Sequence, residues 1–156
     1  MTNFQIKSLQ EEAFTALFNL ADSALQQQGI RRMTATIKPG FPCRVSLEDA
    51  EPGEEVLLLP YQHHRTNSPY QSTGPVFIRK AAKTAAPGIN EIPFMLQYRL
   101  LSLRGYDSSG MMKNAMVTEG KSLTESLHRM FAAEEISYIH IHNAKAGCYN
   151  CVAERI

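Results

Sequence analysis

The sequence predicts an α+β fold: a mainly antiparallel sheet with helices near the N-terminus and before the last two strands. Three observations support this prediction. Segments that alternate apolar and polar residues, as strands do, outnumber segments with helical spacing. The clearest pair of strands is separated by a short polar turn, which is typical of a hairpin. No series of alternating strands and helices is present, so nothing indicates a parallel sheet.

The first part of the chain predicts two strands and two helices. Residues 4–9 alternate and predict a first strand. Asp22 is expected to cap a short helix that stops at Gly29. Residues 30–37 alternate with β-branched side chains and predict a second strand. Between the first strand and Asp22, residues 10–20 predict a helix because apolar side chains recur at helical spacing, namely Ala13, Phe14, Leu17 and Phe18.

Prolines and glycines divide the middle of the chain. Residues 38–43 contain two prolines and a glycine, so we expect a stiff, extended loop. One helical turn is expected at residues 46–49. Residues 55–62 and 76–80 predict strands. The polar residues 63–74 between them predict a twelve-residue loop, and loops of that length in compact domains are usually functional.

The following segment predicts a short helix and a hairpin. Pro93 suits the first position of a helix that ends near Tyr98. Residues 100–107 and 111–119 predict two strands. The residues Asp107-Ser108-Ser109-Gly110 predict the tight turn that joins them.

The end of the chain predicts a helix followed by two strands. Ser122 and Glu125 have the spacing of a capping box, which marks the start of a helix. Residues 136–142 and 149–153 then predict the last two strands. The helix has one apolar face, formed by Leu123, Leu127, Met130 and Phe131.

Length and composition indicate an ordinary globular protein. The 156 residues suit one domain over residues 1–156, with 44% hydrophobic and 20% charged residues. The 16 Lys and Arg residues nearly balance the 15 Asp and Glu residues, which argues against a nucleic-acid-binding protein. No apolar run is long enough to span a membrane. The N-terminal residues lack the pattern of a secretory signal and the three cysteines suggest free thiols, so we expect a cytoplasmic protein.

The most informative segment for function is the predicted strand that contains His140 and His142. Successive side chains of a strand point to opposite faces. Ile139 and Ile141 are therefore expected in the core, and Tyr138, His140 and His142 on the other face.

Two histidines at this spacing can serve several functions. They can act in acid–base catalysis or ligand binding, or simply meet solvent or a hydrogen-bonding neighbour. They can also hold a metal ion together with a third ligand. Candidates for the third ligand are His63, His64, Cys148 and Asp107. The metal site that we expect as an alternative consists of His140, His142 and His63.

Two cysteines and an asparagine are further candidates for the site. Cys148 comes shortly after His142 and is a candidate nucleophile, because a histidine neighbour can activate a thiol. Cys43, in the stiff loop, is a second candidate. A small buried residue is the common alternative for each. Asn143 can bond either its own turn or a ligand.

Arginines indicate a site for an anion. No acidic residue occurs from residue 56 to residue 90, whereas Arg79 lies in that stretch. Arg44 and Arg104 are further candidates, and Arg104 is expected to share a strand face with Ser102. Arginine binds carboxylate and phosphate groups bidentately, so a small anionic molecule is the expected partner. The alternative is that these arginines lie in solvated loops or cover the rim of the sheet.

Two stretches resemble a known family. One is residues 39–50, PGFPCRVSLEDA, and the other runs from His140 to Cys148. Together with residues 74–79, GPVFIR, and the total length, they make nearly the whole chain resemble the short bacterial proteins called domain of unknown function 1203. The resemblance implies a bacterial, one-domain protein. It implies no activity, cofactor or catalytic residue.

Three functional hypotheses follow. The first is an enzyme or ligand-binding protein with a polar site of His, Cys and Arg residues for a small anion. The second is a metal-dependent site built on His140 and His142. The third is a non-catalytic interaction domain, which would present an apolar patch or an open sheet edge. Neither a cofactor nor an oligomeric state follows from these residues.

Overall fold

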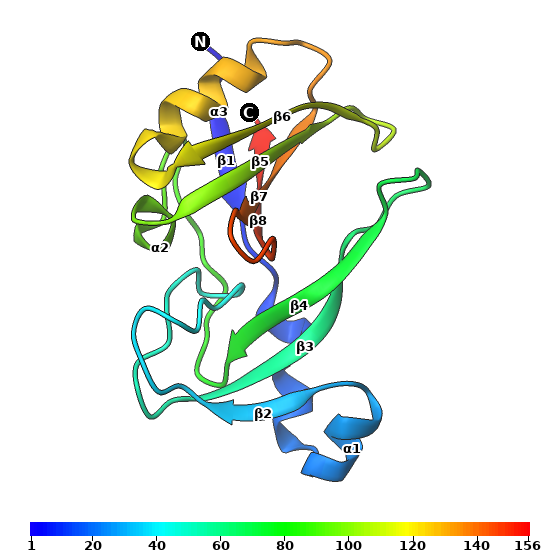
Figure 1. Ribbon diagram of the computed structural model, residues 1–156, viewed down its shortest axis with the longest axis vertical. Coiled ribbons are helices and arrows are strands. Elements are labelled where there is room, and N and C mark those ends of the chain that lie inside the picture. Colours follow the sequence, from blue (N-terminus) through cyan, green and yellow to red (C-terminus); the bar gives the residue numbers. More distant parts are fainter.

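The protein contains two antiparallel sheets, seen in a computed structural model that describes residues 1–156 (Figure 1). The larger sheet has five strands in the order β1-β8-β7-β5-β6, and the smaller has three in the order β2-β3-β4. This arrangement confirms the α+β prediction. The strands are β1 (Phe4–Lys7), β2 (Arg31–Thr34), β3 (Glu55–His64), β4 (Ser72–Arg79), β5 (Leu100–Tyr106), β6 (Met112–Glu119), β7 (Tyr138–Asn143) and β8 (Tyr149–Arg155).

Helix α3 (Leu123–Phe131) covers one face of the larger sheet (Figure 1). Its apolar face joins Ile139 and Ile141 of β7 in one buried cluster of 16 residues. The predicted hairpin of β5 and β6 is confirmed, and its turn contains Gly110 at a φ of +80°. A short helix, α2 (Phe94–Gln97), precedes this hairpin. None of the helices is long and apolar enough to cross a membrane.

The smaller sheet has its own core. Eleven buried residues form it, including Leu57 and Leu59 of β3 and Val76 and Ile78 of β4. Helix α1 (Asp22–Gln27) contributes Leu25 to the same cluster. In Figure 1, α1 and β2 lie at the end of the molecule that is farthest from α3. The two sheets meet near the middle of the molecule, where the His63 ring at the end of β3 packs against rings of β7 and β8.

The far end of the β3–β4 hairpin is tied to the β5–β6 turn. The Ser68 hydroxyl donates to the carbonyl of Gly110 at 2.8 Å, and the Thr66 hydroxyl donates to the carbonyl of Ser109 at 3.3 Å. These bonds hold the end of β3 beside the larger sheet. They explain how two consecutive histidines at that end come to face β7.

Two expected elements near the N-terminus differ. Residues 10–20 form two short 3₁₀ helices, Glu11–Ala13 and Thr15–Asn19, instead of one α-helix. Phe14 lies between them with a φ of −123°, outside the helical range, and its side chain is buried in the core of the smaller sheet. Asp22 is the first helical residue and Ala21 is the cap, so the predicted side-chain cap is absent.

Two predictions later in the chain were also wrong. The capping box does not form, because Ser122 ends the 3₁₀ helix Gly120–Ser122 and has a ψ of 10° where a cap residue is extended. The loop expected at residues 63–74 is shorter, since β3 continues to His64 and β4 begins at Ser72. Pairing with β4 extends β3 past Pro60 into a polar segment that gives no strand pattern of its own.

Candidate metal centre

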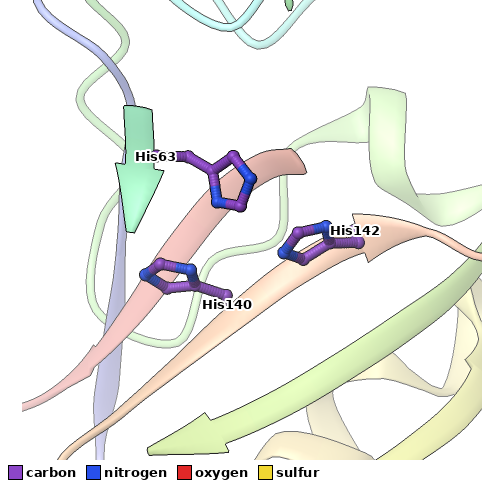
Figure 2. A group of neighbouring side chains, drawn as sticks. All are labelled: His63, His140 and His142. Carbon is purple, nitrogen blue, oxygen red and sulfur yellow. The ribbon is translucent and has the colours of Figure 1, made fainter. Parts of the chain in front are cut away.

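Three histidines meet where the two sheets approach each other. His63 comes from the end of β3, and His140 and His142 come from β7. Figure 2 shows the three rings around a common space, with one nitrogen of each ring turned toward the other two. One ligand nitrogen from each ring lies within 4.8 Å of the other two.

The alternation of β7 places its two histidines together. Ile139 and Ile141 point into the core under α3, as expected, and His140 and His142 emerge from the opposite face. That face meets the smaller sheet rather than solvent, so His140 is 5% exposed and His142 is 1% exposed. Water therefore competes little for their nitrogen atoms.

The third histidine is positioned by the β3–β4 hairpin. The register of β3 shifts between Tyr61 and His64, which interrupts the regular pairing at His63. The His63 ring stacks on the Tyr149 ring with a centroid distance of 5.1 Å and an angle of 12°. Gly74 lies across the hairpin, and a Cβ atom there would contact the imidazole at 3.7 Å. The Tyr149 ring thus covers one face of the imidazole, and the backbone of Gly74 lies near its edge.

Each of the three rings has one buried nitrogen without a hydrogen-bond partner in the protein. These atoms are Nδ1 of His63, Nδ1 of His140 and Nε2 of His142. A buried polar atom without a partner costs about 1–3 kcal/mol, so three of them in one place need a reason. A metal ion that accepts all three lone pairs is such a reason.

His142 is held in the tautomer that a metal ligand needs. Its Nδ1–H donates to the backbone carbonyl of Gly147 at 2.9 Å. In the neutral ring this leaves the lone pair on Nε2, the atom that has no partner. Metal-bound histidines are commonly oriented by a bond of this kind from the second ring nitrogen.

The environment keeps the three imidazoles neutral at neutral pH. Burial, followed by the charges of neighbouring histidines and Arg104, lowers the pKa of His140 to about 2. Burial also lowers the pKa of His63 and of His142 to about 4 each. Only the neutral imidazole binds a metal ion, so these rings need lose no proton on binding.

The spacing of the three nitrogen atoms is close to that of a metal site. Atoms within 4.8 Å of one another can share an ion no farther than about 2.8 Å from each, compared with 2.0–2.1 Å for a Zn–N bond. Side-chain movements of less than about 1 Å would close the site. Three histidines leave the fourth position of a tetrahedral ion open, as in catalytic zinc sites.

Aromatic rings surround the three histidines. The Tyr149 ring lies edge-on to His140, with centroids 5.1 Å apart, and the Tyr106 ring does so at 5.3 Å. His64 is a neighbour but not a ligand, because both of its nitrogens are engaged. Its Nδ1–H donates to the carbonyl of Tyr70 at 2.7 Å, and its Nε2 accepts from the Tyr138 hydroxyl at 2.7 Å.

Arg104 belongs to the same face as the histidines. It lies directly opposite His140 in the β5–β7 pairing, and side chains at opposed positions project from the same face of a sheet. Ser102 lies opposite His142 in the same way. The predicted face of β5 is therefore part of the site.

Arg44 is bonded to the backbone of Tyr149, one of the aromatic residues around the histidines. It is 2% exposed, and its Nε donates to the carbonyl of Tyr149 at 2.7 Å. Burial lowers its pKa to about 10. This bond supports the backbone of β8 next to the histidine cluster and so helps to position Tyr149.

Arg79 and Cys43 serve the structure elsewhere. The Arg79 guanidinium pairs with Glu54 at 2.9 Å and Glu48 at 3.3 Å, which leaves no uncompensated charge for an anion. Cys43 is buried in the core of the smaller sheet, where its Sγ accepts from the Arg79 backbone N–H at 3.3 Å.

The remaining predicted residues shape the turn between β7 and β8. Cys148 is partly exposed and its backbone carbonyl accepts from the Asn143 N–H at 2.8 Å. The Asn143 side chain accepts from the Asn150 amide at 2.7 Å. Neither Cys148 nor Cys43 hydrogen-bonds to a histidine, so the Cys–His pair expected of a nucleophile is not assembled.

Sequence reasoning missed Tyr149, which contacts all three histidines. Its place in the last predicted strand was clear, but its neighbours depended on the register between β7 and β8. That register shifts between Ile141 and His142, which brings Tyr149 opposite His142. No local pattern reveals such a shift.

Fold and site together define the class of this protein: a two-sheet α+β protein with a buried cluster of three histidines between its sheets. The family follows from comparison of sequences. The chain belongs to the family described as "Protein of unknown function (DUF1203)", whose sequence profile matches residues 40–155. The matched region contains all three histidines. No curated protein and no solved structure matches the chain.

Proposed function

We propose that this protein binds one divalent transition-metal ion through His63, His140 and His142 and leaves a coordination position open for water or a substrate. The observation that carries the proposal is the set of three buried, unpartnered ring nitrogens that face one another. Imidazole ligands suit zinc, copper, iron and nickel.

The low pKa values of the histidines favour metal binding over acid–base catalysis. A general acid or base works best when its pKa lies near the operating pH. The pKa values of His140 and His142, about 2 and about 4, lie well below neutrality. These rings are thus poor proton carriers at pH 7 and good metal ligands.

An open position on a three-histidine metal site defines a class of chemistry. A bound metal ion lowers the pKa of its water, which supplies hydroxide as a nucleophile near neutral pH. The aromatic side chains around the cluster, Tyr149 and Tyr106 among them, would limit the access of bulk water. We therefore propose that the protein is a metal-dependent enzyme that acts on small molecules. We also propose a cytoplasmic location, because its cysteines are free thiols.

The test is a titration of untagged, chelator-treated protein with zinc sulfate, followed by calorimetry and elemental analysis. We expect one ion per chain and a higher melting temperature with zinc. His63→Gln and His142→Gln should each lose the zinc effect. His128→Gln is the matched control, because His128 donates to the carbonyl of Thr2 and lies outside the cluster.

Two outcomes would reject the proposal. One is the absence of stoichiometric zinc, cobalt, nickel, copper or iron binding by a folded wild-type protein. The other is zinc binding that His128→Gln weakens as much as His63→Gln does, because binding would then be non-specific.

A further inference from the structure

Arg104 is a half-buried cation without a partner. No hydrogen bond or ion pair to another residue satisfies its guanidinium, although other half-buried arginines of this protein, such as Arg32 and Arg79, pair with carboxylates. Partly buried charges are usually paired, because desolvation without compensation is unfavourable. An unpaired guanidinium on the face that carries the histidines therefore needs an external partner.

No carboxylate offsets this charge at the site. The histidine cluster contains no Asp or Glu residue, and the side chains whose charges act most on the three imidazoles are other histidines, Arg104 and Arg44. A dication bound by neutral ligands would add further positive charge. Metal ion and guanidinium repel each other unless an anion lies between them.

We infer that the open position of the metal site takes a small oxyanion, either a carboxylate or a phosphate, that the metal ion and Arg104 bind together. This inference rests on the metal site proposed above. Arginine suits the role because its planar fork binds two oxygen atoms of such a group. Arg104 thus defines a substrate class, a carboxylic acid or a phosphate, free or as a phosphate monoester.

The geometry supports a shared ligand. Arg104 and His140 occupy directly opposed positions on neighbouring strands, where Cβ atoms are about 4.5–5.5 Å apart. A long guanidinium side chain can reach from there over the space beside the imidazole. An oxyanion between the two would touch both the ion and the fork.

The test uses protein loaded with cobalt(II), whose visible absorption reports changes in coordination. Acetate, bicarbonate and inorganic phosphate are titrated separately, which distinguishes a carboxylate from a phosphate site. Wild-type protein should show a saturable spectral change with at least one of them. Arg104→Gln should weaken the binding of that anion by at least about tenfold, which is the loss expected for a charge-assisted hydrogen bond. It should also bind cobalt more tightly, because a repelling charge is removed.

The matched control is Arg65→Gln. Arg65 is exposed and lies two residues after His63, so this variant makes the same change of net charge outside the site. It should alter neither affinity by more than about twofold at physiological salt, because exposed charges are screened. Arg104→Met, which keeps an apolar stem, is the second variant should Arg104→Gln fold poorly.

The outcomes separate the two proposals. Failure of the folded wild type to take up cobalt or zinc rejects the metal site, and the anion site with it. Uptake of metal without any anion response, or an anion response that Arg104→Gln and Arg104→Met leave unchanged, rejects the anion site alone. An equal loss in Arg65→Gln also rejects it, because the effect would then be one of net charge.

Discussion

Acid should destabilise the metal-free protein through the buried histidines, and the size of the effect can be worked out. In the unfolded chain, His140 and His142 take up a proton at the ordinary pKa of 6.5. In the folded protein they stay neutral until about pH 2 and about pH 4. Below pH 6.5 the unfolded state therefore binds more protons, and the free energy of unfolding falls as the pH falls.

At pH 5 the solution is 1.5 pH units below the ordinary pKa of 6.5. Each unit corresponds to about 1.36 kcal/mol, so each imidazole that stays neutral lowers the free energy of unfolding by about 2 kcal/mol. His140 and His142 together give about 4 kcal/mol. His63 adds less, because its ring is only partly buried and solvent screens it. Domains of this size are stable by about 5–15 kcal/mol, so the change is large.

Urea unfolding of chelator-treated protein at pH 7.5, 6.5, 5.5 and 5 measures this effect. The free energy of unfolding should be constant above about pH 7 and fall steadily below pH 6.5. In His140→Gln, about 2 kcal/mol of the loss between pH 7.5 and pH 5 should disappear, because one titrating group is gone. His128→Gln controls for a histidine outside the cluster. Equal stability of the wild type at pH 7.5 and pH 5 would show that the rings are not held neutral, and the reasoning would fail.

Three further predictions concern the site and its support. Zinc affinity measured by calorimetry should change by less than about threefold between pH 7.5 and pH 5.5. Protons do not compete for the rings in this range, because the pKa is about 4 for His63, about 2 for His140 and about 4 for His142. A tenfold loss of affinity per pH unit would contradict this. Gly110→Ala should weaken zinc binding and lower the melting temperature, because its Cβ atom would overlap Thr66 and push the β3–β4 hairpin away from the larger sheet. Gly53→Ala, with a φ of +94° and open space around it, shares only the backbone strain and should leave zinc affinity unchanged. Asp49→Asn should lower the free energy of unfolding by about 3 kcal/mol in urea titrations at pH 7, because it breaks a buried ion pair with Arg99; a change below about 1 kcal/mol would mean that the pair is replaced by other contacts.

Local patterns predicted much of the fold and the two histidines that β7 contributes to the site. Alternation along β7 gave the shared face of His140 and His142, and a turn motif gave the hairpin of β5 and β6. Both patterns depend on residues that are neighbours in the chain. The same reasoning failed for residues 10–20, where Phe14, with a φ of −123°, divides the expected helix into two 3₁₀ helices.

The rest of the site depends on contacts between distant segments. His63 was a candidate third ligand but was expected in a loop, because the end of β3 is polar and its strand character comes from pairing with β4. Tyr149 reaches the cluster through a register shift between β7 and β8. Cys148 was a candidate because it follows His142 closely in sequence, and Cys43 because it lies in a stiff loop, but neither position in the chain brings the thiol into a hydrogen bond with a histidine.

The ligands of the proposed ion come from two sheets that have separate cores, with His63 on one side and His140 and His142 on the other. An ion bound there would act as a cross-link between two layers, much as a disulfide ties two segments together. Metal affinity would then include the free energy of docking one layer on the other. Hydrogen exchange at β3 and β7 should slow on loading, while exchange in the outlying α1 stays as it was.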